Sequence, residues 1–510
     1  MRLASADEMR AIDRAAIDGC GIPGRELMER AGAAVARAAR ALLSPGGRVL
    51  AVCGGGNNGG DGYVAARLLR DAGVEARAAA LAPRAALHGD ALAAREAAER
   101  AGVPIDDPAD PGQLDAAPGD VILDALLGTG LVRAPEGAYA AAIARVGALR
   151  EGGARVVAVD VPSGLSSDTG QPLGPCVRAD RTVTFGFAKR GLVLHPGAEL
   201  AGDVEVADIG IPPAAAARVP IGCELLAEEE ARALVPPRPP DAHKGDAGRV
   251  LVVAGSPGKS GAAHLALTGA LRGGAGLVTL AAREEVLPFA LAGRPEAMSV
   301  PLLGNGPLGD ADLDPLLAAA KGMDAAVVGP GIPRGPETAR LLRAFLERAG
   351  VPVVLDADAL NALAERPGLV SGIPVPAILT PHPGEMARLV GGTIAAVQAD
   401  RVALAAGRAR AWGCVVVLKG ARTVVAAPGA PAAVIPTGNP GMATGGTGDV
   451  LAGLAGALLA GHLPAFDAAR AAAFVHGLAG DLAAARWGQR GLLASDLADA
   501  VGQVWARWSR

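Results

Sequence analysis

The chain has few of the features that mark exported or membrane-bound proteins. Its five cysteines are odd in number, scattered and never spaced as CxxC, which predicts reduced thiols in the cytoplasm. No uninterrupted apolar run approaches about 18 residues, and the first eight residues carry charges where a signal peptide needs an apolar stretch. We therefore expect neither export nor membrane insertion.

Aromatic residues and excess basic charge are also scarce. Only 2% of the residues are aromatic although 51% are hydrophobic, so cores of Ala, Val, Leu and Ile are expected, which suits α/β layers. A formal net charge of -4 on 510 residues provides no basic field for nucleic acid or a membrane surface. Small molecules are the expected partners. The chain exceeds the roughly 250 to 300 residues at which one core stops growing, so at least two domains are expected.

Short apolar runs separated by helix-like, Ala-rich stretches indicate parallel α/β architecture in both halves. Helical spacing runs from Asp7 to Leu43, with a Gly-Ile-Pro-Gly break at residues 21–24. The expected strands are 48–53, 74–80, 121–123 and 156–159 in the first half, and 249–254, 325–328, 351–355, 377–380 and 415–419 in the second. The first half is predicted to be doubly wound.

A Pro-rich segment, residues 209–240, separates the two alternating patterns. It contains a short acidic helix expected at 228–234. The boundary is placed near residue 220, which predicts domains of residues 1–215 and 222–510. The motifs differ between the halves, so no internal duplication is expected.

A glycine-rich loop follows the first expected strand and precedes a helix expected over 63–69. Its sequence is Gly54-Gly55-Gly56-Asn57-Asn58-Gly59-Gly60-Asp61-Gly62. Backbone N–H groups in such a loop suit a phosphate at the positive end of a helix. The match to GxGxxG is weak by itself, because a tight turn or a dehydrogenase using Glu75 as ribose ligand would also produce it. A dehydrogenase would need hydride-transfer partners, and none is obvious.

Two acids, Asp124 and Asp160, stand at the ends of later strands. Ligands of a doubly wound sheet bind outside the carboxyl ends of its strands, so both acids are expected to converge with the glycine loop. Either acid could instead cap a following helix or turn. Two acids beside a Gly-Asn loop favour a site.

Three segments, 57–62, 124–131 and 160–164, in this order resemble the NAD(P)H-hydrate epimerase family, and the resemblance covers roughly residues 1–215. It implies a Rossmann-like fold with Asp160 as the acid/base at C6 of the hydrated ring. It implies potassium ligation by Asn58, Asp124 and Ser163, an oxygen-only set that suits a hard cation. The residues implied to hold the hydrated dinucleotide are Asn57, Asn58, Gly59, Gly60, Asp61, Gly128, Thr129, Gly130, Leu131, Val132, Arg133, Ala134 and Asp160. The loop departs from the family at Gly55-Gly56, where Gly-Asn is more frequent.

The strongest pattern of the second half is Gly445-Gly446-Thr447-Gly448-Asp449, before a helix expected over 450–459. Successive backbone N–H groups there would form an anion hole for a transferring phosphoryl group. Asp449 would then accept a hydroxyl proton as general base, unless it only caps the helix. The arrangement resembles the ribokinase-like superfamily. By contrast, Gly258-Lys259-Ser260 fails as a P-loop, because Val253 stands where a glycine is required, and an ordinary strand–helix turn is expected.

Further segments at 243–248, 329–331, 356–360, 380–385 and 418–420 make residues 222–510 resemble the NAD(P)H-hydrate dehydratase family. His382 lies between two prolines, a rigid frame that could aim its imidazole at a substrate. Asp358 is expected to be a helix N-cap, and neither it nor Asp356 is given a catalytic role. The resemblance implies that the hydrated dinucleotide contacts Gly261, Ala262, Ala263, Gly331, His382 and Asp449. It implies that the nucleotide contacts Lys419, Gly420, Ala421, Arg422, Thr423, Gly445, Gly446, Thr447 and Gly448.

Together the resemblances imply a bifunctional repair enzyme for hydrated NADH and NADPH. The first domain would interconvert the R and S hydrates, and the second would use ADP with Mg²⁺ to phosphorylate the C6 hydroxyl of the S hydrate before elimination. Two other readings stay open: a small-molecule kinase with an appended dinucleotide-binding regulatory domain, and a first half that only binds. ADP against ATP, NADH against NADPH, and whether the chain forms a homo-oligomer are left open by the sequence.

Overall fold

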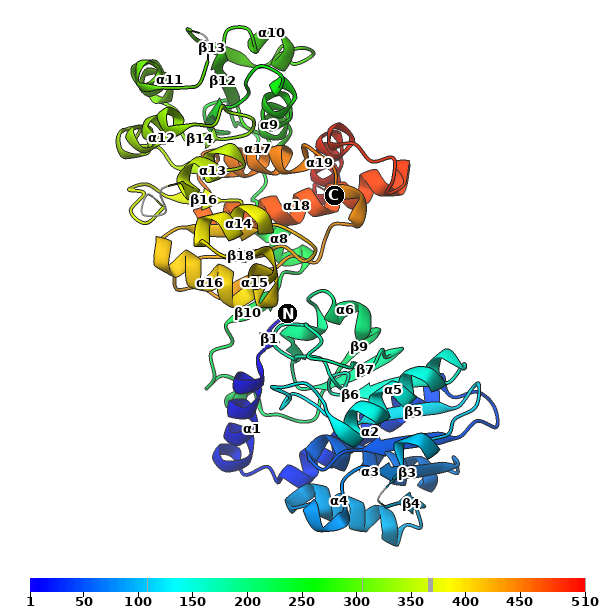
Figure 1. Ribbon diagram of the computed structural model, residues 1–510. Helices are drawn as coiled ribbons and strands as arrows, with labels where there is room; N and C mark the ends of the chain where they lie inside the picture. The colour runs from blue at the N-terminus through cyan, green and yellow to red at the C-terminus, as the bar shows by residue number, and fades with distance from the viewer. Residues whose placement is uncertain (108, 305, 366–369, 510) are drawn as a thin grey trace. The chain divides into compact units, whose positions relative to one another are not determined.

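The computed structural model describes residues 1–510 except 108, 305, 366–369 and 510, and it divides into two compact units (Figure 1). The N-terminal unit is Arg2–Gly222, and the C-terminal unit is Cys223–Arg510 together with Met1. The division lies inside the Pro-rich segment. No helix among the described residues is long and apolar enough to cross a lipid bilayer.

The N-terminal unit is built on a sheet whose neighbouring strands all run parallel. Within the described residues the order is β4-β3-β2-β5-β6-β7-β9. The strands are β2 (Val49–Cys53), β3 (Ala76–Ala80), β4 (Ile105–Asp106), β5 (Val121–Ala125), β6 (Arg155–Val159), β7 (Arg181–Phe185) and β9 (Asp203–Ala207), while β1 (Leu3–Ala4) pairs separately with β8 (Ala188–Lys189). The order reverses at β2, which has β3 and β5 as neighbours, so the expected doubly wound, Rossmann-like class is confirmed.

Helices cover both faces of this sheet. They are α1 (Ala6–Cys20), α2 (Gly24–Leu42), α3 (Asn57–Asp71), α4 (Gly89–Arg100), α5 (Gly137–Glu151), α6 (Gly197–Leu200) and α7 (Pro213–Ala216). The apolar residues of α2, α3 and α4 pack against one face, and those of α5 pack against the other. The break between α1 and α2 falls at residues 21–23, as the Gly-Ile-Pro-Gly pattern predicts.

The start of α3 differs from the expectation. The helix begins at Asn57, with Gly56 as its N-cap, and not at Tyr63. Residues 57–61 are therefore the first turns of the helix and not a loop. A Cβ at Gly59 would lie 2.1 Å from the carbonyl oxygen of Gly54, so only a glycine lets the helix approach the preceding turn this closely.

The C-terminal unit holds a larger, mixed sheet. Within the described residues its order is β10-β19-β18-β17-β16-β15-β14-β11-β12-β13, parallel except at the pairs β17–β18 and β18–β19. The strands are β10 (Cys223–Leu225), β11 (Arg249–Val253), β12 (Leu277–Arg283), β13 (Met298–Leu302), β14 (Ala325–Val328), β15 (Val353–Leu355), β16 (Ala377–Leu379), β17 (Val415–Leu418), β18 (Val424–Ala426) and β19 (Ala432–Val434). The strand order reverses beside β11, which lies between β12 and β14.

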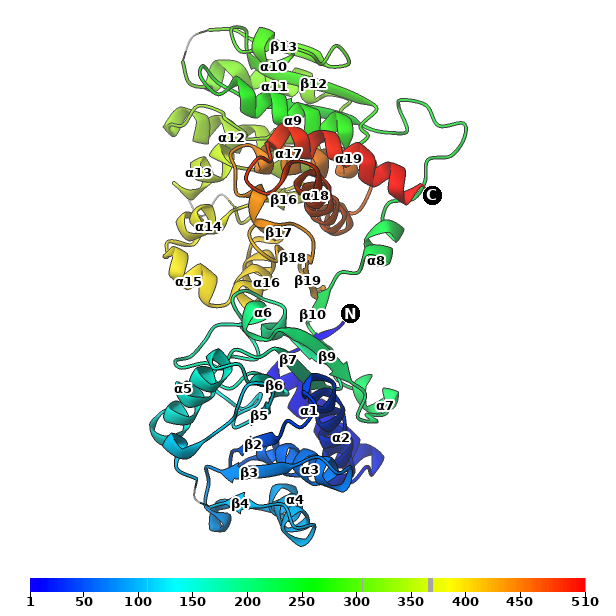
Figure 2. The same cartoon turned by 90° about the vertical axis from the view of Figure 1, so that its right-hand side faces the viewer.

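Helices also flank this sheet (Figure 2). They are α8 (Glu228–Ala233), α9 (Ser260–Arg272), α10 (Leu287–Ala290), α11 (Leu313–Ala320), α12 (Pro336–Arg348), α13 (Asp358–Ala364), α14 (Pro383–Val390), α15 (Ile394–Ala399), α16 (Arg401–Trp412), α17 (Thr447–Ala460), α18 (Ala465–Trp487) and α19 (Ala494–Trp508). The apolar residues of α9, α17, α18 and α19 form one core with the sheet. Gly269 and Gly453 let the backbones of α9 and α17 approach, because a Cβ at either would clash with a backbone oxygen of the other helix.

The expected strands are all present, although several others are not among the expected set. Strand β9 reads Asp-Val-Glu-Val-Ala and is largely exposed at the sheet edge, so its composition is too polar to stand out. Helix α17 begins at Thr447 and not at Val450, with Gly446 as its N-cap at φ +95°. Asp449 therefore lies in the first turn of the helix and is not its N-cap.

Candidate functional sites

A cavity of about 650 Å³ opens at the carboxyl edge of the N-terminal sheet, beside the strand-order reversal. The residues of the sequence-based set that line it are Asn57, Asn58, Asp61, Gly128, Thr129, Gly130, Leu131, Val132, Arg133 and Asp160. The rest of that set, Gly59, Gly60 and Ala134, is not part of the described lining. Gly60 serves packing, because a Cβ there would lie 2.6 Å from the methyl carbon of Met28.

Asp160 is held in a strained conformation beside a buried lysine. It follows β6 with φ +66°, a region in which non-glycine residues are strained and which clusters at functional sites. Its Oδ1 lies 2.6 Å from Nζ of Lys189 and accepts a hydrogen bond of 3.0 Å from Oγ1 of Thr184. Lys189 also donates to Thr184 and to the carbonyl oxygen of Phe185. The pair is thus positioned from β7 and β8.

Two further carboxyl groups, Asp13 and Asp61, line the same cavity. Burial raises the pKa of Asp13 to about 6, with Lys189 lowering it and Asp160 raising it. Burial also raises the pKa of Asp61 well above its ordinary value, and the Asp160 charge adds to that rise. The cavity therefore offers proton donors and acceptors together.

Asp124 and Ser163 form a buried polar pair beneath the cavity. Oδ1 of Asp124 accepts from Oγ of Ser163 at 2.5 Å, and Oδ2 accepts from the Ser163 backbone at 2.8 Å. Burial raises the pKa of Asp124 to about 6, because these bonds compensate only part of the desolvation. Asn58 lies close by: a Cβ at Gly128 would be 3.1 Å from its Oδ1, while Leu127 donates to Ser163. The structure thus groups the three residues around the 127–128 segment.

Residues 445–448 of the C-terminal unit, called the glycine turn below, lead directly into α17. The first N–H groups of a helix have no partner within it, so those at Thr447, Gly448 and Asp449 are available to an anion. His476, buried on α18, contacts the Thr447 carbonyl oxygen through Nε2 at 2.8 Å. Burial lowers the pKa of His476 to about 4, so the neutral ring donates this bond and holds the turn.

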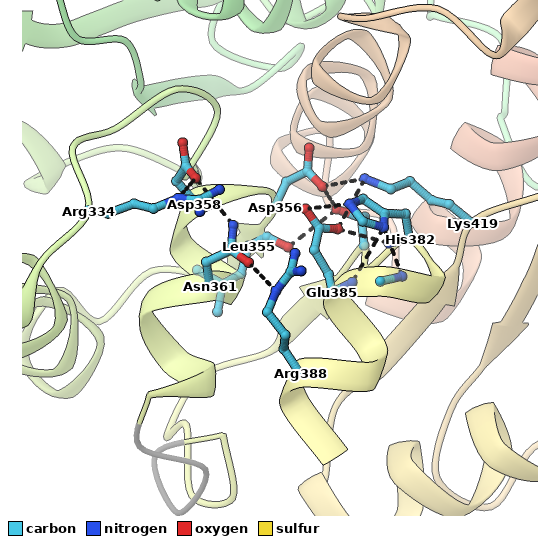
Figure 3. A network of polar contacts seen from close by, with 11 residues as sticks. Arg334, Leu355, Asp356, Asp358, Asn361, His382, Glu385, Arg388 and Lys419 are labelled. Carbon is cyan, nitrogen blue, oxygen red and sulfur yellow. Dashed lines mark hydrogen bonds and ion pairs between the residues drawn. The ribbon is translucent and has the colours of Figure 1, made fainter. Parts of the chain in front are cut away.

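Asp449 is electrostatically coupled to Asp356, Lys419 and Glu385. Figure 3 shows the contacts among these last three residues. Nζ of Lys419 lies 2.6 Å from Oδ1 of Asp356 and 3.9 Å from Glu385. Burial would lower the pKa of Lys419, but these two carboxylates raise it above its ordinary value. Burial and the Asp356 charge raise the pKa of Asp449 to about 7. Lys419 is thus committed to Asp356, and Asp449 titrates near neutrality.

Asp356 itself is almost fully buried, with 1% of its surface exposed. Its Oδ1 also accepts from Oγ1 of Thr380 at 2.7 Å. Among the described residues its Oδ2 has no hydrogen-bond partner. That oxygen would be 3.8 Å from a Cβ at Gly448, so it faces the glycine turn. Asp356, to which the sequence assigned no catalytic role, therefore lies at the site.

His382 is the N-cap of α14, which its position between two prolines did not predict. Nδ1 accepts from the backbone of Gly384 at 3.0 Å, and Nε2 lies 3.4 Å from Oε1 of Glu385. Burial lowers the pKa of His382, so its neutral form is favoured. Half of the side chain is exposed, which leaves the ring accessible at the sheet edge.

The segment 419–423 follows β17 and is braced by a buried arginine. Arg401 donates to the carbonyl oxygens of Leu418 and Lys419, and burial lowers its pKa to about 10. Arg422 has φ +57° and donates to the carbonyl oxygen of Pro436. Lys419 is therefore fixed from two sides, by Asp356 and by the Arg401-bound backbone.

The remaining residues predicted to contact the dinucleotide, Gly261 to Ala263 and Gly331, lie where β11 and β14 end. A Cβ at Gly331 would be 2.9 Å from that of Ala262, so Gly331 is adjacent to residues 261–263 at the start of α9. Asp358 is nearby, and its expected role as N-cap is wrong. It is the first residue of α13, whose N-cap is Ala357, and its carboxylate binds Lys259 and Arg334.

Several residues of these sites carry no distinctive pattern in the sequence. Asp13, Lys189, Arg401 and His476 lie in helices or a short strand, and only the fold brings them to the sites. Lys189 and Arg401 each stand next to another charged residue, Arg190 and Asp400, so no local pattern marks them as buried.

Both units place acids and glycine turns at the carboxyl edge of a parallel sheet, beside the point where strand order reverses. Dinucleotides and phosphates bind at such edges. The two sites therefore define a class: an enzyme with a Rossmann-like unit and a ribokinase-like unit.

Comparisons with known proteins identify the family. A family model described as NAD(P)H-hydrate dehydratase matches residues 250–503, and one described as YjeF-related protein N-terminus matches residues 24–191. A bifunctional NAD(P)H-hydrate repair enzyme of Moorella thermoacetica is 44% identical over 99% of this chain and 96% of its own. One from Escherichia coli is 37% identical over 98% of this chain and 93% of its own. The chain belongs to the family of bifunctional NAD(P)H-hydrate repair enzymes.

A solved structure supports the C-terminal assignment. The ADP/ATP-dependent NAD(P)H-hydrate dehydratase of Bacillus subtilis, co-crystallised with ATP and Mg²⁺, is 34% identical with a TM-score of 0.50. The match covers 57% of this chain and all of that one. The C-terminal unit therefore has the ribokinase-like fold of that dehydratase.

Proposed function

We propose that the chain repairs hydrated NADH and NADPH at two sites. Residues 1–215 form the epimerase, which interconverts the R and S hydrates at C6. Residues 222–510 form the dehydratase, which returns the S hydrate to NADH or NADPH while ADP becomes AMP and phosphate. The observation that carries this proposal is Asp449, whose pKa is raised to about 7, in the first turn of the helix that follows the glycine turn.

At the epimerase site, Asp160 is the acid/base group at C6. Its contact with Lys189 fixes the carboxylate toward the cavity, so Lys189 is a positioning residue. The dinucleotide contacts residues 57–61 and 128–134, with the N–H groups at the start of α3 available to a phosphate. Asp13 and Asp61, with their raised pKa values, supply protons nearby.

At the dehydratase site, Asp449 accepts the proton of the C6 hydroxyl as that oxygen attacks the terminal phosphorus of ADP. The N–H groups of residues 445–448 stabilise the transferring phosphoryl group. Lys419 and the 420–423 segment hold the nucleotide, and Gly261 to Ala263, Gly331 and His382 hold the dinucleotide. Phosphate then leaves from C6, the neighbouring ring carbon C5 loses a proton to solvent, and the ring double bond between C5 and C6 is restored. A general base with a pKa near the working pH is effective in both directions of proton transfer.

Two cations are part of the proposal. Potassium would be held by Asn58, Asp124 and Ser163, and the fit is good because Asp124 is a buried carboxylate bonded to hydroxyl and N–H groups. Bound potassium would balance the negative charge of the Asp124 carboxylate. Mg²⁺ would accompany ADP and neutralise its phosphates. Oδ2 of Asp356 has no hydrogen-bond partner within the part of the chain that the structure describes, and it faces the glycine turn, so it suits a cation there.

The five cysteines are free thiols, which supports a reducing, cytoplasmic location. The partners of the proposal are hydrated NADH, hydrated NADPH and ADP.

One assay tests the proposal. Chemically hydrated NADH is incubated with the full chain and Mg²⁺, with ADP in one sample and ATP in another, and the absorbance of NADH is followed. We expect the absorbance to recover with one AMP and one phosphate released per NADH when ADP is supplied. Accumulation of a stable phosphorylated product would instead support the small-molecule kinase.

A further inference from the structure

Two cations of the C-terminal unit share one buried carboxylate. Nζ of Lys259 lies 3.0 Å from Oδ2 of Asp358, and Nε of Arg334 lies 2.5 Å from Oδ1. Figure 3 shows Arg334 and Asp358 in contact, apart from the Lys419 network. The Asp358 side chain is 8% exposed, whereas those of Lys259 and Arg334 are 49% and 62% exposed. The acid is covered and both cations face outward.

The cluster carries surplus positive charge and surplus hydrogen-bond donors. Burial would raise the pKa of Asp358, but Arg334 and Lys259 hold it below its ordinary value, so the acid is ionised. The single negative charge of Asp358 thus balances only one of the two positive charges. A lysine has three N–H donors and an arginine five, and within the described residues each cation uses one of its donors on Asp358. The unused donors are available to an anion.

The position of the cluster links it to the dinucleotide. Lys259 follows β11 and Arg334 follows β14, the two strands between which the strand order reverses. Ligands bind in the crevice at such a reversal. A Cβ at Gly331 would lie 3.1 Å from that of Lys259, so the cations stand beside the glycine assigned to the substrate. Among the described residues, chain neighbours and the α9 backbone aside, no atom lies within 4 Å of a Cβ built at Gly258 or Gly261, so there is open space beside Lys259.

We propose that Lys259 and Arg334 bind a phosphate of the hydrated dinucleotide, with Asp358 positioning both cations. The inference rests on the proposed dehydratase function. When the C6 hydroxyl lies at Asp449, the rest of the dinucleotide must extend along the sheet edge. Lys419 at β17 serves ADP, whereas the cluster at β11 and β14 serves the substrate. Lys259, whose segment Gly258-Lys259-Ser260 does not form a P-loop, therefore binds phosphate together with Arg334.

The phosphate can be the pyrophosphate, common to both hydrates, or the 2′-phosphate, found only in the NADPH form. Lys259→Met, Arg334→Met and the double variant are assayed with each S hydrate at saturating ADP. Hydrogen bonds to charged groups contribute about 1.5 to 3 kcal/mol, so each single change should raise KM for the hydrate by about 10- to 100-fold. Both hydrates should be affected equally if the pyrophosphate is bound, and only the NADPH hydrate if the 2′-phosphate is bound. KM for ADP and kcat should stay at wild-type values.

The controls separate binding from folding. Arg343, half-exposed on α12 and paired with Glu347, is a matched surface arginine, and Arg343→Met should change no kinetic constant. Lys259→Arg keeps the charge and should restore most of the affinity. Melting temperatures of all variants are measured alongside. An unchanged KM for both hydrates in the double variant overturns the inference, as does a rise in KM for ADP alone.

A failure of the proposed function would be seen separately, because the wild type would then turn over neither hydrate. In that case the fluorescence of NADPH is used to measure its dissociation constant for the wild type and for the double variant. Weaker binding by the double variant would still support the phosphate contact. Equal binding would overturn it.

Discussion

The two halves of the chain use the same pair of side chains, an aspartate and a lysine, in opposite ways. In the N-terminal unit Lys189 directly contacts Asp160, the acid proposed for epimerisation, at 2.6 Å. In the C-terminal unit Lys419 contacts a different acid, Asp356, also at 2.6 Å. Burial and the charge of Asp356 together raise the pKa of Asp449 to about 7.

The difference corresponds to the two proposed reactions. The epimerase acid needs a fixed direction, and a buried lysine holding one oxygen supplies it. The dehydratase base must take a hydroxyl proton at neutral pH, and a raised pKa gives it the required basicity. The partner of the lysine therefore distinguishes the two acids. Lys189 holds Asp160 in position, whereas Lys419 binds Asp356 and leaves Asp449 with a raised pKa.

The largest expected effect is that of Asp449→Asn. Asn is nearly isosteric but cannot accept the hydroxyl proton, and a general base contributes about 10²- to 10⁴-fold in rate. Single-turnover dehydration of the S hydrate should slow by that factor, while epimerisation and nucleotide binding are unchanged. Equal single-turnover rates for the variant and the wild type would remove Asp449 from the mechanism.

Asp160→Asn should have the reciprocal effect. Enzymatic conversion of the R to the S hydrate should fall by about 10²-fold, the lower end of the range, because Asp13 and Asp61 remain in the cavity as proton carriers. Dehydration of pure S hydrate should be unaffected. The two epimers can be followed separately by chromatography. If the variant consumes R hydrate at the wild-type rate, Asp160 is not the acid/base group.

A moderate effect is expected from the pH dependence of the dehydratase. Asp449 acts in its ionised form, so kcat/KM for the S hydrate should fall as the pH drops through about 7. Asp356→Asn removes a negative charge that raises the pKa of Asp449, so the acid limb should move to lower pH. Asp314→Asn, at an exposed position of α11, is the control and should leave the profile unchanged. An unmoved limb in Asp356→Asn would show that the charge of Asp356 does not raise the pKa of Asp449.

The smallest effect is expected from separating the halves. The two compact units divide between Gly222 and Cys223, and each has its own sheet and core. A fragment of residues 222–510 should fold and dehydrate S hydrate at close to the rate of the full chain. An insoluble or inactive fragment would show that the dehydratase depends on the first half.

The sequence predicted the sheets well because their signal is local. Short apolar runs such as 156–159 mark buried strands, and acids such as Asp160 mark the ends of those strands. The glycine turns also stood out, although α3 and α17 begin earlier than expected, since glycines in both belong to the first helical turn. A short segment of sequence contains enough information to predict a buried strand, the acid at its end or a glycine turn.

The partners of the site acids could not be predicted in this way. Lys189 reaches Asp160 only because β7 lies beside β6, and Lys259 reaches Asp358 across 99 residues of chain. His382 was expected to aim at substrate, yet it also caps α14, which depends on the backbone direction after β16. Such contacts arise from strand order and packing, which no single segment encodes.

The central claim is that two distinct sites act in sequence, the epimerase supplying S hydrate to the dehydratase. It is tested most directly by giving an equal mixture of R and S hydrated NADH, with ADP and Mg²⁺, to the wild type, to Asp160→Asn and to Asp449→Asn. The account predicts full recovery of NADH by the wild type and rapid recovery of only the S half by Asp160→Asn. It predicts epimerisation without recovery by Asp449→Asn. Rapid recovery of both halves by Asp160→Asn, or of either half by Asp449→Asn, would contradict it.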